Sequence, residues 1–458
     1  MELPRCLNTV FPSPSTTTSP ETTVIIGAGV IGLSTAYYLA QALNETTSYM
    51  PPYEPDVVVI DSSHDICAGA SGKATGGLGN FGFRPETSSL GSLSYKLHKE
   101  LASKYNGREK YKFSDLSIYR VSSKNFAGNP SPPDSWSSSA PIDKNISDLP
   151  PWINPSNDWK VQLLADAPHA AHLDPEQFCR FLRHQCENLG VRFLLNSEVT
   201  SVQRDHARQS FTSITVQTRD TQAAHIVPCR AIVIAAGPWS TRVFSQLFPA
   251  GHLNLRMDTM NSAGNHVLLR NPRWEPAHDK NGVGQVFLNN VVNSSNNLDI
   301  TAFLGGYLYI GGWGAKPECL PEFAEGVHSQ PDEIEEMLKV SRQYFHLEDN
   351  EELEIVKPGR CYRPLAIPNI PTITKVSWEM LGNPKFGSEA HCSSFKFNNS
   401  PVIGGLYLNT GHNSDGVTLG PGSGKVMSEL LLGHTLSVSI SNFGLNNGEK
   451  SLPWKLRL

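Results

Sequence analysis

A glycine-rich segment, VIIGAGVIGLSTAYYLAQAL at residues 24–43, constrains this chain more than any other part of its sequence. A short apolar run leads into three spaced glycines, and apolar side chains then recur at helical spacing, which predicts a strand, a tight turn and a helix. The first glycine turns the chain, the second lets the backbone approach a pyrophosphate, and the third lets the helix pack closely on the strand. The unpaired N–H groups at the start of such a helix attract phosphate. The segment therefore predicts a dinucleotide site formed by Gly27, Ala28, Gly29, Val30, Ile31 and Gly32, with a glycine-rich turn of a flavodoxin-like domain as the alternative.

A second apolar run, VVVI at residues 57–60, predicts the neighbouring strand of the same site. It ends on Asp61, the acid expected to hydrogen-bond a ribose hydroxyl, and Ser62 follows it. The spacing from the glycine motif is longer than usual because a proline-rich segment at 51–55 lengthens the connection.

Another glycine-rich stretch, CAGASGKATGGLGNFGF at residues 67–83, fits neither helical nor strand periodicity. Small side chains and many exposed N–H groups suit a flat, phosphate-bearing cofactor. Ser71 and Lys73 could reach a pyrophosphate, and Gly76 and Gly77 would let the chain pass close to a ring. The alternative is a flexible surface loop.

Composition excludes several classes of function. The chain has 458 residues, enough for two or three domains, a formal net charge of −5 and no long basic run, so no nucleic-acid partner is expected. No apolar stretch is long enough to span a membrane, and we expect no membrane partner. Eight cysteines without C-x-x-C pairs argue against structural zinc and against a disulfide framework, and no metal site is expected.

The N-terminal residues 1–22 are rich in Pro, Ser and Thr, which predicts a disordered leader without a signal peptide. The expected location is intracellular, in the cytoplasm, with the peroxisome as the alternative because of the C-terminal Lys-Leu-Arg-Leu. The oligomeric state is left open.

The rest of the chain contains secondary-structure signals of differing clarity. Asp174 and Pro175 predict the start of a helix that runs to about residue 188, followed by a strand. Residues 231–240 predict a buried strand that breaks at Gly237. Residues 127–160 are expected to form an insertion, and 246–356 a set of strands over the cofactor domain with an acidic helix at about 331–346. A strand at 406–409 leads to a helix expected to start after Pro421.

Five blocks stand in an order that resembles the D-amino-acid oxidase superfamily of FAD-dependent oxidoreductases, which includes glycine and sarcosine oxidases, and most closely a fungal group within it. The blocks are VIIGAGVIG, VVVID, GASGKATGG, VIAAGPWS, and CYRP with GHNSDGVTLGPGSGK. The resemblance implies an α/β fold with a discontinuous, Rossmann-like FAD-binding domain of the glutathione-reductase type and a second, mixed-sheet substrate domain. The implied FAD-binding segments are 23–98, 166–245 and 357–440; the substrate domain takes 99–165 and 246–356, and 441–458 forms a tail.

Carried over to this sequence, the resemblance assigns the cofactor contacts in groups. The glycine motif and Asp61 would hold the ADP half, and Val199 would pass its backbone near the adenine. A helix after Pro421 would direct its positive end toward the flavin. The remaining implied contacts are Ser71, Gly72, Lys73, Gly76, Gly77, Ala236, Gly237, Trp239, Gly411, His412, Asn413, Gly416 and Val417.

The same resemblance points to the chemistry. Arg363 matches the arginine that binds a substrate carboxylate, a task that suits a planar, permanently charged fork; a structural arginine is the alternative. Cys361 lies where some relatives attach FAD covalently, although a non-covalent cofactor is favoured here. Tyr309 stands where the sarcosine-oxidase branch has a lysine that activates oxygen, which leaves oxidase and dehydrogenase open. Tyr309 and His412 complete the candidate catalytic residues.

The expected reaction is oxidation of a carbon–nitrogen bond of an amino acid or secondary amine, by hydride transfer to flavin N5. One alternative is an FAD-dependent oxidoreductase of specialised metabolism that acts on a non-amine substrate, and another is a non-catalytic flavoprotein. A flavin monooxygenase is disfavoured because the chain has GHNSDG where that class carries a Gly-Asp motif.

Overall fold

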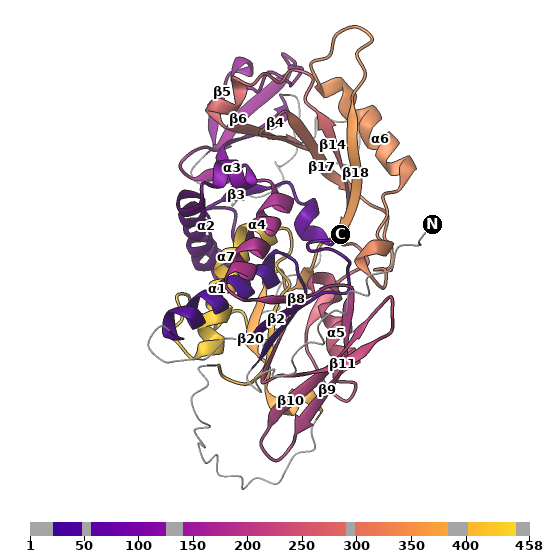
Figure 1. The fold of residues 1–458 in the computed structure, drawn as a ribbon. Coiled ribbons are helices and arrows are strands. Elements are labelled where there is room, and N and C mark those ends of the chain that lie inside the picture. The colour runs from indigo at the N-terminus through magenta and orange to yellow at the C-terminus, as the bar shows by residue number, and fades with distance from the viewer. Residues whose placement is uncertain (1–21, 48–55, 125–140, 290–297, 383–401, 446–458) are drawn as a thin grey trace, which may run out of the picture.

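The computed structural model describes residues 22–47, 56–124, 141–289, 298–382 and 402–445 (Figure 1). Three expected segments therefore lie wholly or largely outside the described residues: the leader, the proline-rich segment at 51–55 and the tail. Thr22, the last residue of the expected leader, is fully buried.

A six-stranded sheet forms the centre of the lower part of the molecule in Figure 1. Its strand order is β20-β21-β12-β1-β2-β8, and all neighbouring pairs are parallel except β20 with β21. The strands are β1 (Thr23–Ile26), β2 (Val57–Ile60), β8 (Arg192–Leu194), β12 (Ala231–Ile234), β20 (Thr372–Lys375) and β21 (Gly405–Thr410).

Both faces of this sheet are covered, which explains why the central strands β2 and β12 are continuous apolar runs. Alternate residues such as Ile25 and Val59 face helices, whereas Val24 and Val58 face a second layer of strands. The helical layer contains α1 (Val30–Thr47), α2 (Pro85–Tyr105), α3 (Gly107–Tyr111), α4 (Pro175–Asn188) and α7 (Gly416–Leu432). The other layer contains β9 (Ser197–Asp205), β10 (Ser210–Thr218), β11 (Ala224–Pro228) and α5 (Ser240–Leu247).

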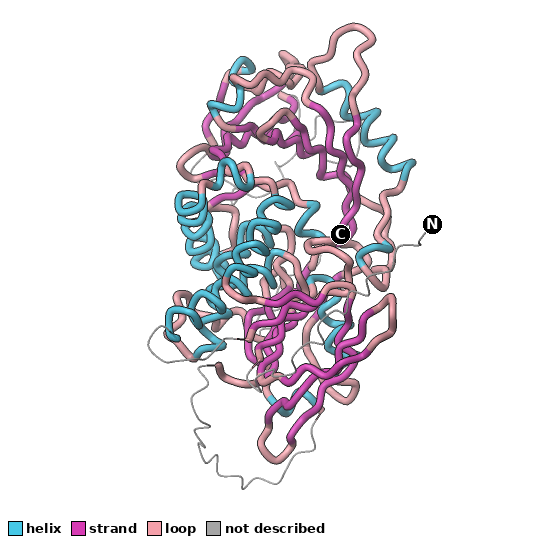
Figure 2. Tube along the Cα trace, in the orientation of Figure 1, coloured by secondary structure: helices cyan, strands magenta, loops and turns pink. Residues whose placement is uncertain are grey.

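A ten-stranded sheet with its own core forms the upper part, and Figure 2 shows it facing the helical layer. Its main order is β18-β14-β17-β16-β15-β4-β6-β5, with β7 pairing both β4 and β3. The strands are β3 (Gly77–Gly79), β4 (Ser114–Ser123), β5 (Ile142–Lys144), β6 (Trp159–Ala165), β7 (Ala170–His172), β14 (Ala263–Arg270), β15 (Val283–Asn289), β16 (Leu298–Phe303), β17 (Tyr307–Gly314) and β18 (Ile355–Tyr362). Helix α6 (Pro331–Ser341) packs against it, and β13 (Arg256–Asp258) pairs β19 (Leu365–Ile367) nearby.

This arrangement confirms the predicted fold class, because a Rossmann-like sheet built from distant segments is combined with a mixed sheet. The predicted helix after Asp174 is also confirmed, and the Asp174 carboxylate accepts a hydrogen bond from the Gln177 N–H at 3.0 Å. Two expectations are wrong in detail. The glycine-rich stretch at 67–83 contains a 3-10 turn (Ala70–Lys73) and strand β3, and the acidic helix ends at Ser341.

The predicted start of the last helix is wrong as well, because α7 begins at Gly416 and contains Pro421 in its interior. Proline lacks an N–H, so the helix leaves the carbonyl of Val417 without its usual partner. The ring of His98 hydrogen-bonds that carbonyl at 2.9 Å. The Ser94 hydroxyl donates to the Thr418 carbonyl at 2.6 Å and accepts from the Gly422 N–H at 2.8 Å. Helix α2 therefore supplies the partners that the interrupted α7 lacks.

Within the described ranges, no helix is both long and apolar enough to cross a membrane.

Candidate active site

A cavity of about 1010 Å³ lies between the two sheets. Its lower wall includes the ends of β1, β2, β12 and β21, where parallel strands of a Rossmann-like sheet place their ligands. Its upper wall is the face of the ten-stranded sheet. The volume is at the top of the range of roughly 300–1,000 Å³ typical of small-molecule sites, which suits a cofactor together with a substrate.

Two glycines shape the turn between β1 and α1. Gly27 has φ +115°, and a Cβ there would lie 2.4 Å from the carbonyl oxygen of Ala235. A Cβ on Gly32 would lie 1.9 Å from the carbonyl oxygen of Gly27. Side chains at these positions would push α1 away from the sheet, so glycine is required for the close packing that directs the start of α1 into the cavity.

Asp61 lies at the end of β2 on the cavity wall. Its carboxylate accepts hydrogen bonds from the N–H groups of Ala28 at 2.7 Å and Ser63 at 2.8 Å. Burial raises the pKa of this carboxyl, and the two backbone donors oppose that rise. A carboxylate fixed in this way beside the glycine turn can accept a further hydrogen bond from a ribose hydroxyl.

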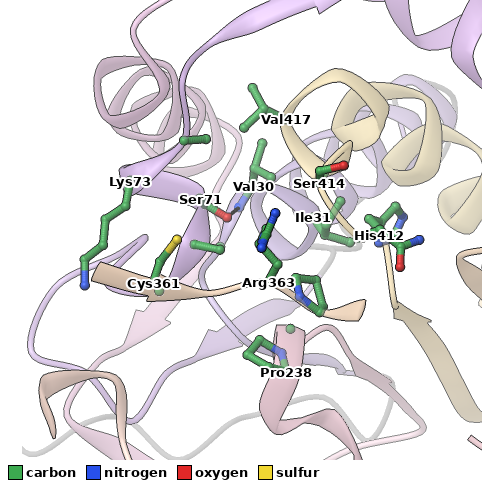
Figure 3. Close-up of a pocket in the computed structure, with 18 of the residues that line it drawn as sticks. Val30, Ile31, Ser71, Lys73, Pro238, Cys361, Arg363, His412, Ser414 and Val417 are labelled. Carbon is green, nitrogen blue, oxygen red and sulfur yellow. Dashed lines mark hydrogen bonds between the residues drawn. The ribbon is translucent and has the colours of Figure 1, made fainter. Parts of the chain in front are cut away.

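The hydroxyl of Ser71 accepts a hydrogen bond from the N–H of Val30, at the start of α1, at 3.0 Å. Ser71 therefore lies where a phosphate would bind. The neighbouring Lys73 extends in another direction, and Figure 3 shows its amino group pointing away from Val30 and lying on the side of Cys361. Burial lowers the pKa of the Lys73 ammonium.

The loop between β21 and α7 forms the opposite part of the lower wall. His412 is buried there, its Nε2 lies 2.8 Å from the Ser423 hydroxyl, and burial lowers its pKa to about 3. His412 is therefore neutral at physiological pH and is available for hydrogen bonding only. The first residues of α7, Gly416 and Val417, also line the cavity, so the positive end of the helix dipole faces it.

Arg363 lies on the cavity wall just after β18. Asn413 holds the turn that follows it, because its side chain accepts from the Ala366 N–H at 2.8 Å and its own N–H donates to the Pro364 carbonyl at 3.1 Å. Within the described ranges no carboxylate forms an ion pair with Arg363, whose Nε is 3.4 Å from the Ser262 carbonyl. In Figure 3 its guanidinium points into the space bordered by Ser71 and Val417.

The arginine three residues earlier has a different environment. Arg360 is 2% exposed and pairs with Glu333 at 2.8 Å and Glu318 at 2.7 Å. Arg360 is therefore structural, whereas Arg363 is left for a ligand.

Tyr309 and Cys361 lie on the upper wall. The Tyr309 hydroxyl donates to the Lys73 carbonyl at 3.0 Å, and its ring stacks on that of His266 at 5.0 Å, so this side chain ties the two walls together. Burial raises the pKa of the Cys361 thiol. Because the thiolate is the reactive form, this shift disfavours the thioether chemistry that a covalent link would need.

Most of the predicted cofactor residues line this one cavity, while four pack behind it. Two of these four, Gly72 and Gly76, lie in close contact with the backbone of other residues. A Cβ on Gly72 would lie 2.7 Å from the Cys67 carbonyl oxygen, and a Cβ on Gly76 would lie 2.0 Å from the Leu173 carbonyl oxygen. Trp239, by contrast, lines the cavity, and its indole N–H donates a hydrogen bond to the Pro321 carbonyl at 2.8 Å. The lining residues are Gly27, Gly29, Val30, Ile31, Asp61, Ser62, Ser71, Lys73, Gly77, Val199, Ala236, Gly237, Trp239, Tyr309, Cys361, Arg363, Gly411, His412, Asn413, Gly416 and Val417; those behind are Ala28, Gly32, Gly72 and Gly76.

Sequence reasoning missed several polar residues of the upper wall, among them Arg120, Gln285 and Asp299. Asp299 accepts hydrogen bonds on one carboxylate oxygen from Gln285 at 2.9 Å and from Thr301 at 3.2 Å, and burial raises its pKa to about 6. The available signals were a charged residue inside the largely apolar strand that contains Asp299, and the position of Arg120 in β4, in step with the alternate apolar residues Leu116 and Ile118.

We expect Asp299→Asn to become more stable relative to the unmodified protein as the pH rises. The folded-state pKa of Asp299 is about 6, above the reference value of 3.8, so its stabilising contribution is present below pH 3.8 and is lost between pH 3.8 and 6. The difference in free energy of unfolding should therefore shift by up to about 3 kcal/mol between pH 4 and 7. Denaturant titrations of both proteins across this range measure it, and a pH-independent difference would refute it.

A glycine-rich turn at the ends of parallel strands, which faces a mixed sheet across one cavity, is an arrangement that fits an enzyme with a dinucleotide cofactor. The profile of the family described as DAO, FAD dependent oxidoreductase, matches residues 22–430, and the chain belongs to this family. The glycine turn, Asp61 and the two helix starts fit FAD, which is the cofactor of the family.

Relatives and solved structures agree with this assignment. A Schizosaccharomyces pombe protein named "Putative oxidoreductase C1F5.03c" is 26% identical over 447 residues, which cover 94% of this chain and 98% of that protein. Glycine oxidase from Bacillus cereus has a similar fold, with a TM-score of 0.64, 21% identity and coverage of 90% of this chain and 95% of its own. L-Amino acid deaminase from Proteus myxofaciens gives a TM-score of 0.66 at 15% identity, with 94% of each chain covered.

Proposed function

We propose that this FAD-dependent oxidoreductase oxidises the carbon–nitrogen bond of an amino acid or secondary amine that carries a carboxylate. The observation that carries the proposal is Arg363, whose guanidinium lines the cavity without a carboxylate partner among the described residues. An arginine without a carboxylate partner attracts an anion, and its planar fork matches a carboxylate with two hydrogen bonds.

Arg363 would orient the substrate by its carboxylate, and the turn held by Asn413 would keep the guanidinium in place. Such fixed orientation lowers the barrier because the reacting groups no longer have to find each other. Tyr309 cannot serve as a base while its hydroxyl donates a hydrogen bond to the backbone carbonyl of Lys73. Burial also keeps the pKa of Tyr309 well above its ordinary value. His412 stays neutral. The substrate would therefore react as the neutral amine, with binding and orientation as the contribution of the protein.

When bound, FAD supplies the two-electron acceptor for the carbon–hydrogen bond beside the nitrogen. The positive end of α7 faces the cavity and would stabilise negative charge there.

The test is an anaerobic titration of the FAD-loaded protein with amino acids, N-methylated amino acids, amines without a carboxylate and hydroxy acids. The proposal expects bleaching of the flavin band by carboxylate-bearing amines and weaker or no bleaching by the amines that lack one. Reduction by hydroxy acids alone would instead favour a non-amine substrate. A flavin that no amine reduces would overturn the proposal. The rate of reoxidation by air would then separate oxidase from dehydrogenase.

A further inference from the structure

A row of side chains crosses three neighbouring strands, β4, β15 and β16, on the cavity face of the ten-stranded sheet. The register places Arg120 of β4 opposite Phe287 of β15, Phe287 opposite Asp299 of β16, and Asp299 opposite Gly311 of β17. Arg120, Phe287 and Asp299 all line the cavity. Neighbouring strands are about 4.8 Å apart, so the backbones of Arg120 and Asp299 are separated by about 10 Å, with the phenylalanine between them.

Arg120 is 7% exposed, and its one hydrogen bond in the described structure runs from Nη2 to the Gln162 side-chain oxygen at 3.1 Å. The Gln162 amide group donates in turn to Asp143 at 3.0 Å, so the glutamine carbonyl is held toward the guanidinium. A glutamine is neutral. Within the described ranges no carboxylate forms an ion pair with Arg120, which leaves a nearly buried positive charge without a counter-charge.

The buried structural arginine of this chain has different surroundings. Arg360 on β18 is paired with two carboxylates, Glu333 and Glu318. A buried charge without such a partner is strongly destabilising, so a fold has no structural reason to retain one. Arg120 resembles Arg363, which also lines the cavity without a carboxylate, and not Arg360.

Arg120 lies beyond the segment expected to hold the cofactor. Gly77 of that segment is close to Leu116 and Gln285, because a Cβ on Gly77 would lie 3.7 Å from the Leu116 side chain and 2.9 Å from the Gln285 oxygen. Alternate residues of β4 share a face, so the step from Leu116 to Ile118 and then to Arg120 leads away from Gly77 along the cavity wall. Arg120 therefore belongs to the substrate end of the cavity.

The geometry points to a second anion site at Arg120, so that the substrate is an extended molecule whose far end carries a carboxylate or phosphate group. This inference rests on the proposed function for the position of the first carboxylate, at Arg363. Five strand spacings separate β18 from β4, which amounts to roughly 24 Å along the sheet before curvature and side-chain reach are allowed for. A short dicarboxylate would not reach both arginines. Apolar side chains, among them Ile118, Leu164 and Phe287, line the cavity and suit a hydrocarbon middle section.

The first experiment compares the thermal stability of the FAD-loaded protein without substrate in two variants, Arg120→Met and Arg360→Met. Methionine keeps much of the arginine volume and removes the charge. We expect Arg120→Met to melt at the same temperature as the unmodified protein or higher, because an uncompensated charge is removed. Arg360→Met should melt several degrees lower, because Glu333 loses its partner. A comparable fall in Arg120→Met would identify Arg120 as structural and overturn the inference.

The second experiment titrates the oxidised holoenzyme with α,ω-dicarboxylates from succinate to dodecanedioate and with monocarboxylates of equal length, and follows the flavin spectrum. We expect the longer dicarboxylates to bind about 10-fold to 100-fold more tightly than monocarboxylates of equal length, and the short ones to show no such preference. Arg120→Met should abolish this preference, and Arg270→Gln, which alters an arginine of the same sheet outside the cavity, should retain it. An ω-phosphono analogue of the tightest ligand distinguishes carboxylate from phosphate.

Equal binding of dicarboxylates and monocarboxylates at every length would overturn the second anion site. Arg363→Gln separates this result from a failure of the proposed function. If Arg363→Gln leaves all binding intact while Arg120→Met removes the preference, the Arg120 site stands and the role proposed for Arg363 fails. If Arg363→Gln weakens both ligand series and Arg120→Met changes neither, the proposed function stands and the Arg120 site fails.

Discussion

Replacing Arg363 by glutamine should lower kcat/KM for carboxylate-bearing amines by about a hundredfold to ten-thousandfold. The two charge-assisted hydrogen bonds of a bidentate pair are worth about 1.5–3 kcal/mol each, and glutamine retains neither the charge nor the fork. Lysine should give an intermediate loss, because it keeps the charge alone. Steady-state kinetics with a substrate identified by the anaerobic panel measures the effect.

Two controls make this result specific. Arg256→Gln alters an exposed arginine of β13, the strand that pairs with β19 just beyond Arg363, and it should leave the kinetics unchanged. Amines that lack a carboxylate should lose little activity in Arg363→Gln, since they make no bidentate pair. An equal loss for amines with and without a carboxylate would show that Arg363 supports the site in another way.

The features that could be predicted well from the sequence are those encoded locally. The turn from β1 to α1 needs Gly27 and Gly32 for steric reasons that involve residues close in sequence or the adjacent strand β12. Asp174 predicts the start of α4 because a capping carboxylate acts within three residues. The order of the separated blocks then indicated the family, and with it the fold class.

The features that could not be predicted depend on distant partners. Two arginines of one short motif differ in role because Glu333, from α6, reaches Arg360 and not Arg363. The start of α7 was misplaced because Ser94 and His98, more than 300 positions away, supply partners to the helix around Pro421. Arg120 and Asp299 were missed because only the register of β4, β15 and β16 brings them onto one wall.

Replacing Gly32 by alanine should prevent the protein from holding FAD and should destabilise the fold by about 4 kcal/mol or more. The added Cβ would lie 1.9 Å from the Gly27 carbonyl oxygen, and a backbone atom cannot move aside as a flexible side chain can. Helix α1 has no room to retreat, because its other side is packed against α7. A Cβ on Gly424 of α7 would already lie 2.4 Å from the Ser34 backbone of α1.

The measurements are the ratio of flavin absorbance to protein and the melting temperature, with two matched glycines for comparison. Gly444→Ala should behave as the unmodified protein, since no described atom lies within 4 Å of the position that its new methyl group would take. At Gly29 the methyl group would meet only the Ser71 side chain, with the hydroxyl at 3.0 Å, so Gly29→Ala should fold while the approach of the pyrophosphate is hindered. Loss of FAD in both Gly29→Ala and Gly32→Ala, with loss of stability in Gly32→Ala alone, would separate the binding role of this turn from its packing role. A Gly32→Ala protein that retains FAD and melts normally would contradict the close packing of α1 on β1.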